Sequence, residues 1–158
     1  MKLVDLFPKT RMLLELKARD KKGVIREMLG VLVAEGRLTE EDARKAERGI
    51  QKRELQGSTG IGKGIAIPHA KNNSFMDGVL GVFARSVDGV PFDSIDGERV
   101  NVVFLVLSSS DHAEQHLQIM KKVAMVHRDE KSLRFLAGHA SSDSILEIFK
   151  EIDDGLNG

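Results

Sequence analysis

The sequence contains no cysteine, and this absence removes three kinds of chemistry. A disulfide framework, a zinc site built on thiolates and a cysteine nucleophile all require that residue. An excess of charge of one sign is also missing, because Lys and Arg total 24 and Asp and Glu total 24. We therefore expect no basic field that would draw the protein to nucleic acid or to an anionic membrane surface, and any phosphate chemistry must be local.

Long apolar runs are missing as well. No stretch approaches the roughly 18 consecutive apolar residues that suggest a membrane-spanning helix. The first 20 residues lack the apolar core and the small-residue cleavage site of a signal peptide. We expect a cytoplasmic protein with no direct membrane insertion.

What the sequence does contain is enough apolar material for a core. Its 158 residues, 41 % of them apolar, suit a single domain over residues 1–158. The segment Lys21–Gly36 has apolar residues at helical spacing and predicts a first helix. A second helix is predicted from Thr39, whose side chain can cap it, up to the glycine-rich segment that starts at Gly57.

Strand patterns alternate with these helices. Residues 12–16 and 78–86 predict strands, residues 88–97 predict turns, and the unbroken apolar run Val102–Leu107 predicts the buried centre of a sheet. Because helices and strands interleave, we expect an α/β (α+β) fold in which a central mixed β-sheet is flanked by helices.

The region after the long strand predicts three further helices. Ser110 or Asp111 is the expected N-cap of the first, with an inner face of Leu117, Met120, Val123 and Ala124. Two shorter helices are expected over residues 130–140 and 142–153.

The segment "GSTGIGKGIAIPHAK", residues 57–71, resembles a phosphate-binding loop that lacks its ending. It matches G-x-x-x-x-G-K-[ST] at Gly57, Gly62 and Lys63, but position 64 is glycine, so the hydroxyl that would hold Mg²⁺ is missing. Pro68 would also break the helix that should follow Lys63. We therefore exclude a nucleotide-binding P-loop.

The five histidines are His69, His112, His116, His127 and His139. His139 lies near the end of a predicted helix, where a cation is favourable, and we interpret it as structural or solvated. His112, His116 and His127 fall within a narrow arc of one helix, which leaves a metal site open. No HExxH motif and no obvious third carboxylate ligand accompany them, so we expect no metal and no cofactor.

His69 has different surroundings, because it follows Pro68 at the end of a short extended segment. A surface histidine beside a turn is the plain alternative. The glycine-rich segment before it can supply unobstructed backbone N–H groups, and two hydroxyls, to an oxyanion. The candidate phosphate cradle consists of Gly57, Ser58, Thr59, Gly60, Gly62 and Gly64. An imidazole that is neutral near pH 7 can then attack a phosphoryl group, provided that its other nitrogen is hydrogen-bonded.

The run "RELQGSTGIGKGIAIPH", residues 53–69, resembles the active-site signature of the enzyme IIA domains of the bacterial phosphoenolpyruvate-dependent phosphotransferase system, of the mannitol/fructose/nitrogen-regulatory type. The resemblance implies a mannitol-type enzyme IIA fold. It also implies that His69 accepts a phosphoryl group from the phosphocarrier HPr, and that His116 and Arg53 complete the catalytic set. Ala70 departs from the family pattern, in which glycine frequently follows the histidine. The resemblance assigns no role to His112 or His127.

Each implied role has an alternative. Arg53 can be a solvated helix residue, and His116 can simply pack against the core. If they are functional, the guanidinium of Arg53 can bind phosphate oxygens, and His116 can donate a hydrogen bond near a helix N-terminus.

The resemblance leaves the acceptor of the phosphoryl group open. With no cysteine in the chain, a cysteine-bearing IIB domain has to be a separate protein. The segment "GSTGIGKGIAIPH" is most similar to the sequences of the nitrogen-regulatory branch, in which phosphorylation controls binding to a target protein. A fructose/mannitol-class transport enzyme IIA is the alternative, and a binding module without phosphotransfer is a third reading.

Overall fold

The computed structural model describes residues 1–157. The helices are α1 (Leu3–Leu6), η1 (Lys9–Arg11), α2 (Lys21–Ala34), α3 (Glu40–Glu54), η2 (Ser110–His112), α4 (Ala113–Arg128), α5 (Glu130–Ala137) and α6 (Ser142–Asn157). The strands are β1 (Met12–Leu13), β2 (Gly60–Gly62), β3 (Ile65–Ala66), β4 (His69–Ala70), β5 (Val79–Val90) and β6 (Val100–Ser108). None of the helices within residues 1–157 combines the length and apolarity needed to cross a membrane.

The strands form one mixed sheet in the order β1-β5-β6-β3-β2, with β4 pairing further along β6. The long strands β5 and β6 are antiparallel, and Phe83 lies opposite Phe104. β1 runs parallel to β5, whereas β3 and β4 run parallel to β6. The expected central mixed sheet is confirmed, and its long strand β6 carries the short strand that contains His69.

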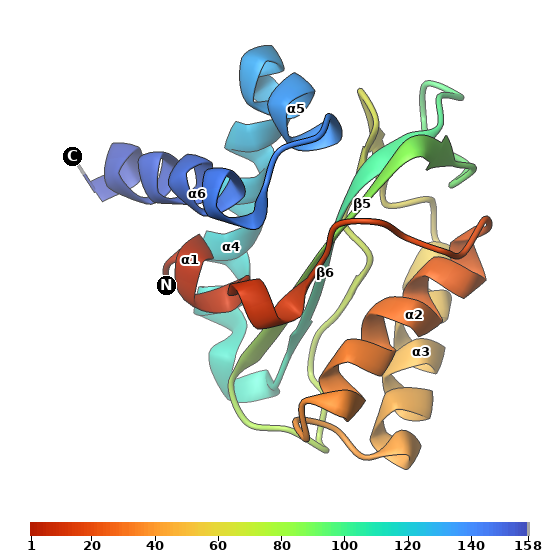
Figure 1. The fold of residues 1–158 in the computed structure, drawn as a ribbon. Coiled ribbons are helices and arrows are strands. Elements are labelled where there is room, and N and C mark those ends of the chain that lie inside the picture. Colours follow the sequence, from red (N-terminus) through yellow and green to blue (C-terminus); the bar gives the residue numbers. More distant parts are fainter. Residues whose placement is uncertain (158) are drawn as a thin grey trace.

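Two helical layers cover this sheet (Figure 1). Helices α2 and α3 lie on one face, and α1, α4, α5 and α6 lie on the other. Successive side chains of a strand point to opposite faces. Accordingly, Val103 and Leu105 of β6 belong to the first core, and Phe104 and Val106 belong to the second.

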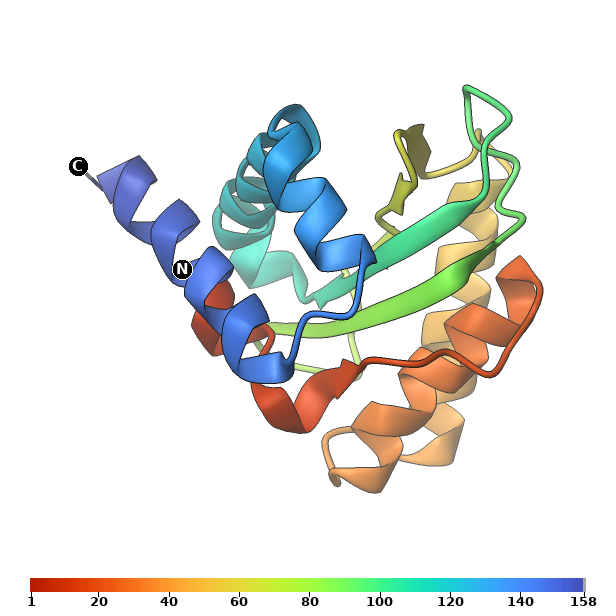
Figure 2. The same ribbon diagram turned by 45° about the horizontal axis from the view of Figure 1, so that its top comes forward.

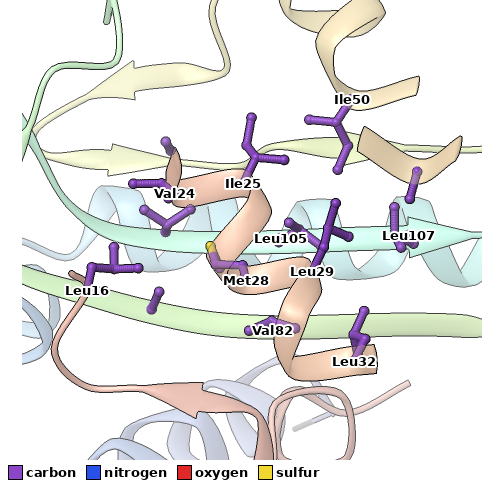
Figure 3. Close-up of a cluster of buried hydrophobic side chains, with 14 of the residues drawn as sticks. Leu16, Val24, Ile25, Met28, Leu29, Leu32, Ile50, Val82, Leu105 and Leu107 are labelled. Atoms are coloured by element: carbon purple, nitrogen blue, oxygen red, sulfur yellow. The ribbon is translucent and has the colours of Figure 1, made fainter. Parts of the chain in front are cut away.

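The first core is aliphatic and is built around α2 (Figure 3). The predicted stripe of this helix is confirmed, because Val24, Ile25, Met28, Leu29 and Leu32 are all buried. The predicted cap of α3 is confirmed too: the Thr39 hydroxyl accepts a hydrogen bond from the backbone N–H of Asp42, at 3.0 Å. Local sequence signals therefore define both helices of this layer.

The second core contains a cluster of four phenylalanines. Phe7, Phe83, Phe104 and Phe149 pack against one another with ring centroids 5.3 to 6.0 Å apart. Their edge-to-face and tilted arrangements are those that aromatic pairs prefer. The rings join α6 and the segment after α1 to the two central strands.

A buried ion pair fastens α1 to this layer. The Nζ of Lys122 lies 2.8 Å from Oδ1 of Asp153, and the backbone N–H groups of Leu3 and Val4 donate to the same carboxylate at 2.8 and 3.3 Å. The carboxylate is thus paired and hydrogen-bonded, as a buried charge must be. The short helix α1 was not expected from the sequence.

Several predicted boundaries differ from the structure. β1 ends at Leu13 and not at residue 16, and α6 has 16 residues and continues past residue 153. β5 continues to Val90, so the predicted turn at residues 88–90 is wrong. The register of β5 on β6 shifts between Arg85 and Val90, and this irregularity lets the strand continue through a glycine at φ +81°.

The predicted start of α4 is also wrong. Residues 110–112 form a separate turn, and His112 occupies the N-cap position without a side-chain cap. Leu117, which was expected on the inner face of this helix, is 56 % exposed, whereas His116 is buried. Val123 is buried as expected, and Ile119 and Val126 are buried with it.

Candidate functional site

The backbone of His69 is held at the edge of β6. β4 pairs with β6 so that His69 lies opposite Val106, whose backbone N–H donates to the Pro68 carbonyl at 3.1 Å. The Nδ1 atom of His69 lies 2.7 Å from the carbonyl oxygen of Ile67. Since a carbonyl can only accept, Nδ1 carries the proton, and the neutral ring has its lone pair on Nε2.

His116 lies beside His69, although it comes from α4 on the far side of the sheet from α3. The two ring centroids are 5.5 Å apart at an interplanar angle of 55°. The His116 side chain is buried, and its Nδ1 lies 2.8 Å from the hydroxyl oxygen of Ser108 at the end of β6. The two histidines of the predicted site are therefore brought together.

Both rings are neutral at neutral pH. Burial lowers the pKa of His69, and the positive charges of Arg53 and Lys71 add to this effect against the opposing influence of the Ile67 carbonyl and Glu54. The pKa of His116 is lowered to about 4, first by burial and then by His69 and Lys71. Removing water disfavours a charged imidazole, so the Nε2 lone pair of His69 remains available.

Arg53 reaches the same place from the opposite layer. It lies in the last turn of α3, and its Nη1 donates to the carbonyl of Gly57 at 2.8 Å. A pocket of about 480 Å³ is lined by Arg53, His69, Lys52 and Lys71 among others, so three cationic side chains surround the nucleophile candidate. Such a pocket attracts an anion.

A close contact between α3 and β4 sets the position of Arg53 relative to His69. Gly49, one turn before Arg53, packs against Ala70, the residue after His69. A Cβ added at position 49 would lie 3.3 Å from the Cβ of Ala70, which is tighter than ordinary contact. Because position 49 is glycine and has no side chain, α3 can lie this close to β4.

The glycine-rich segment forms a hairpin of β2 and β3 instead of an open loop. The N–H groups of Gly57, Thr59 and Gly60 already donate to the Glu54 carbonyl, the Glu54 carboxylate and the Ser58 hydroxyl. The Ser58 hydroxyl donates to the Phe92 carbonyl, and that of Thr59 to Glu54.

Of the remaining two members of the predicted cradle, one ends β2 and the other lies in the hairpin turn. Gly62 and Gly64 have φ values of +94° and +79°, a conformation that favours glycine. Positions 62 and 64 lie against Asp96 and Asn101 respectively. The cradle stays a prediction, and three of its backbone donors are engaged within the protein.

Glu54 is a buried residue of the site that the sequence analysis did not single out. Its carboxylate accepts hydrogen bonds from Lys21 at 2.9 Å and from the backbone N–H of Thr59 at 3.2 Å. It thereby fixes the start of the hairpin against both helices of the first layer. The only local sign of this role is its place directly after Arg53.

Asn73 is the second residue that the sequence did not indicate. Its side-chain amide donates to the carbonyls of Ala70 at 3.0 Å and Ser108 at 2.9 Å. One side chain thus joins the residue after His69 to the serine that contacts His116. Because the contact with Ser108 spans 35 positions, no local spacing in the sequence predicts it.

The other histidines lie apart from this pair. Nδ1 of His112 lies 2.9 Å from the Ser109 hydroxyl and 3.6 Å from an oxygen of Asp77. His139 is exposed. Across residues 1–157, His, Asp and Glu side chains form no group of three or more with metal-binding geometry.

A mixed sheet between two helical layers, with a neutral histidine in a basic pocket, defines the class as a phosphoryl carrier of the enzyme IIA type. Residues 5–152 match the family described as "Phosphoenolpyruvate-dependent sugar phosphotransferase system, EIIA 2". The chain belongs to this family, whose members carry phosphoryl groups, and it is therefore a phosphotransferase. The resemblance of residues 53–69 is confirmed at the level of the family.

The relatives include both branches of this family. The fructose-specific EIIABC component of Bacillus subtilis is 35 % identical over 153 residues, which are 97 % of this chain and 24 % of that protein. The nitrogen regulatory protein of Bradyrhizobium diazoefficiens is 31 % identical over 148 residues, 94 % of each chain. This chain thus spans about a quarter of the first relative and nearly all of the second.

Solved structures confirm the mannitol-type enzyme IIA fold. The nitrogen regulatory protein IIA-Ntr of Neisseria meningitidis superposes with a TM-score of 0.82 at 27 % identity, covering 92 % of this chain and 97 % of that one. The mannitol IIA of Escherichia coli gives a TM-score of 0.71 at 25 % identity, covering 89 % and 96 %.

Proposed function

We propose that Nε2 of His69 accepts a phosphoryl group from the phosphohistidine of an HPr-type carrier protein and passes it onward. The P–N bond of the donor breaks, and its electron pair stays on the donor ring. A new P–N bond forms from the Nε2 lone pair of His69. The His69 proton on Nδ1 stays in its hydrogen bond to the Ile67 carbonyl, so the ring needs no proton transfer to react.

The observation that carries this proposal is the 2.7 Å contact between Nδ1 of His69 and the Ile67 carbonyl. It leaves the lone pair on the other nitrogen, and the lowered pKa of the ring keeps that lone pair unprotonated near neutral pH. A nucleophilic histidine needs both conditions.

Arg53 and His116 are proposed to stabilise the charge that spreads over the phosphoryl oxygens during transfer. A guanidinium binds such oxygens with several donors in a fixed geometry, and Lys71 adds charge at the same pocket. His116, with its ring 5.5 Å from that of His69, is close enough to donate to a group carried there. No metal and no nucleotide take part in this proposal.

The onward acceptor distinguishes two candidate roles. We favour the nitrogen-regulatory role, in which phosphorylation controls a target protein, since a nitrogen regulatory relative aligns over 94 % of both chains. The alternative is transfer to a separate IIB protein in fructose or mannitol transport. A structural neighbour of 23 % identity is the Escherichia coli enzyme IIAMTL in complex with phosphorylated IIBMTL.

The test is incubation with phosphoenolpyruvate, enzyme I and HPr. One acid-labile phosphoryl group should appear on the chain, because a phosphoramidate hydrolyses in acid whereas a phosphoester persists. The His69→Ala variant should not be labelled, and the His139→Ala variant, which removes an exposed histidine, should be labelled normally. Acid-stable label, or full labelling of His69→Ala, would contradict the proposal.

The same assay tests for the nucleotide and metal chemistry that we excluded, and it distinguishes the regulatory role from the transport role. ATP alone should not label the chain, and a chelator should not slow transfer from isolated phospho-HPr. Transfer from the labelled chain to a purified IIB protein encoded nearby would favour sugar transport over regulation.

A further inference from the structure

Two neighbouring serines at the end of β6 each contact a histidine. The Ser108 hydroxyl lies 2.8 Å from Nδ1 of His116, and the Ser109 hydroxyl lies 2.9 Å from Nδ1 of His112. Ser109 has a further partner, because the backbone N–H of Gly78 donates to its hydroxyl at 3.1 Å. Among the residues described, Ser108 has no second side-chain hydrogen bond. The two pairs therefore differ in how many partners the hydroxyl has.

The hydrogen-bond requirement of Ser108 determines the direction of its contact. Its side chain is fully buried, so its O–H needs an acceptor within the protein. If Nδ1 of His116 donated to the serine oxygen, the hydroxyl proton would be left buried without a partner, which is unfavourable. If the hydroxyl donates to Nδ1, both groups are satisfied. Nδ1 of His116 is therefore the acceptor.

This direction fixes the tautomer of His116. With Nδ1 unprotonated and the ring neutral, the proton lies on Nε2. His69 has the opposite arrangement, with its proton on Nδ1 and its lone pair on Nε2. The two adjacent rings thus form a complementary pair, in which one supplies a lone pair and the other supplies an N–H donor.

We propose that Ser108 is a positioning residue for phosphoryl transfer, whose hydroxyl holds His116 in the Nε2–H tautomer so that it can donate to the phosphoryl group. This inference rests on the proposed function of His69. Ser108 touches no reacting atom, and it acts only through His116.

Asn73 supports this geometry from the other side. Its amide bridges the carbonyls of Ala70 and Ser108, and its own backbone N–H donates to the Ser108 carbonyl at 3.0 Å. The serine is therefore fixed relative to the strand that carries His69. The tautomer of one histidine and the position of the other are set by adjoining parts of the same hydrogen-bonded network.

The tautomer can be read directly by long-range ¹H–¹⁵N spectra of the histidine rings, since protonated and unprotonated ring nitrogens have distinct shifts. In the wild-type protein we expect Nε2 of His116 to be protonated and Nδ1 to be unprotonated. In Ser108→Ala we expect a mixture of tautomers and transfer to His69 slowed by about 10-fold. That is less than the ~10²-fold typical for complete loss of an oriented donor, because part of the population keeps the active tautomer.

Two further variants control the experiment. Ser108→Thr keeps the hydroxyl and should restore both the spectrum and the transfer rate. Ser109→Ala removes the neighbouring serine–histidine contact and should leave the His116 spectrum and the transfer rate unchanged.

Three outcomes would overturn the inference: a protonated Nδ1 of His116 in the wild-type protein, an unchanged tautomer in Ser108→Ala, or an unchanged transfer rate in that variant. The wild-type spectrum decides the tautomer even if Ser108→Ala fails to fold. Failure of the wild-type chain to label His69 would overturn the proposed function instead, and the two failures are therefore distinguishable.

Discussion

The two helical layers differ both in their cores and in what they contribute to the site. The layer of α2 and α3 packs an aliphatic core in which Phe92 is the one phenylalanine among the buried residues described. The layer of α1, α4, α5 and α6 packs on a cluster of four phenylalanines. Figure 2 shows the two helical layers on opposite sides of the sheet. Arg53 lies in α3 of the first layer and His116 in α4 of the second, whereas His69 lies in β4 of the sheet.

This division separates two electrostatic tasks. The first layer supplies a permanent cation at the end of a helix, beside a solvent-accessible pocket. The second supplies a buried imidazole that is kept neutral by the same burial that packs its helix. Under the proposed function, the phosphoryl site would take its positive charge from one layer and its uncharged donor from the other.

The largest effect that we predict concerns the stability of the second layer. Phe149→Ala should lower the free energy of unfolding by about 3–5 kcal/mol, because its ring contacts three others and a cavity would remain. Leu32→Ala is the matched change in the first layer and should cost about 2–5 kcal/mol. Urea unfolding monitored by circular dichroism measures both. Equal or smaller loss for Phe149→Ala would show that the aromatic cluster adds nothing beyond ordinary burial.

The next prediction distinguishes residues that stabilise charge during transfer from residues that stabilise the fold. Arg53→Ala and His116→Ala should each slow transfer to His69 by on the order of 10²-fold per folded molecule. Arg53→Ala should keep a melting transition similar to wild type, whereas His116→Ala should also melt somewhat lower, because it leaves the buried Ser108 hydroxyl without its partner. Arg48→Ala removes an exposed arginine from the same helix and should leave the rate unchanged. If either site variant melted far below wild type with a normal rate per folded molecule, that residue would hold the fold and not the transition state.

A smaller effect is expected in the dependence of stability on pH. The pKa of His116 is lowered from 6.5 to about 4 in the folded protein, so between these values the unfolded chain binds a proton that the folded chain does not. The contribution of this group is fully present above about pH 6.5 and is lost as the pH falls towards 4. Unfolding free energies measured across this range should fall less steeply in His116→Ala, and parallel curves for the two proteins would contradict the lowered pKa.

The smallest effect concerns His112, one turn before His116. His112→Ala should be nearly neutral in both the transfer and the melting assay, because this histidine is half-buried and contacts Ser109 and Asp77 instead of His69. If His112→Ala slowed transfer and His116→Ala did not, the second layer would contribute a different histidine from the one we propose.

Local patterns in the sequence were sufficient for the elements whose signals lie within a few residues of one another. The stripe of α2, the cap at Thr39 and the apolar run of β6 are of this kind, and all three are confirmed. The "RELQGSTGIGKGIAIPH" run led to the correct family. The structure brings Arg53, His69 and His116 around one site, and the roles that the resemblance implied stay predictions.

The features that escaped prediction depend on partners far away in the chain. α1 is held by Asp153, about 150 positions later, and four residues alone carry no helical periodicity. The inner face of α4 was misjudged because it includes the polar residues His116 and Lys122, which are buried against the distant partners Ser108 and Asp153. Glu54, Asn73 and Ser108 became visible only when the fold brought their hydrogen-bond partners next to them.

The contact between Gly49 and Ala70 has a consequence for how this site can vary in sequence. A methyl group added at position 49 would lie 3.3 Å from the Cβ of Ala70, so the helix or the strand would have to shift by a few tenths of an ångström to hold both methyl groups. Gly49→Ala alone should therefore move α3 slightly away from β4, whereas Gly49→Ala together with Ala70→Gly leaves a single methyl group between them. A double exchange of this kind would keep Arg53 at its present distance from His69.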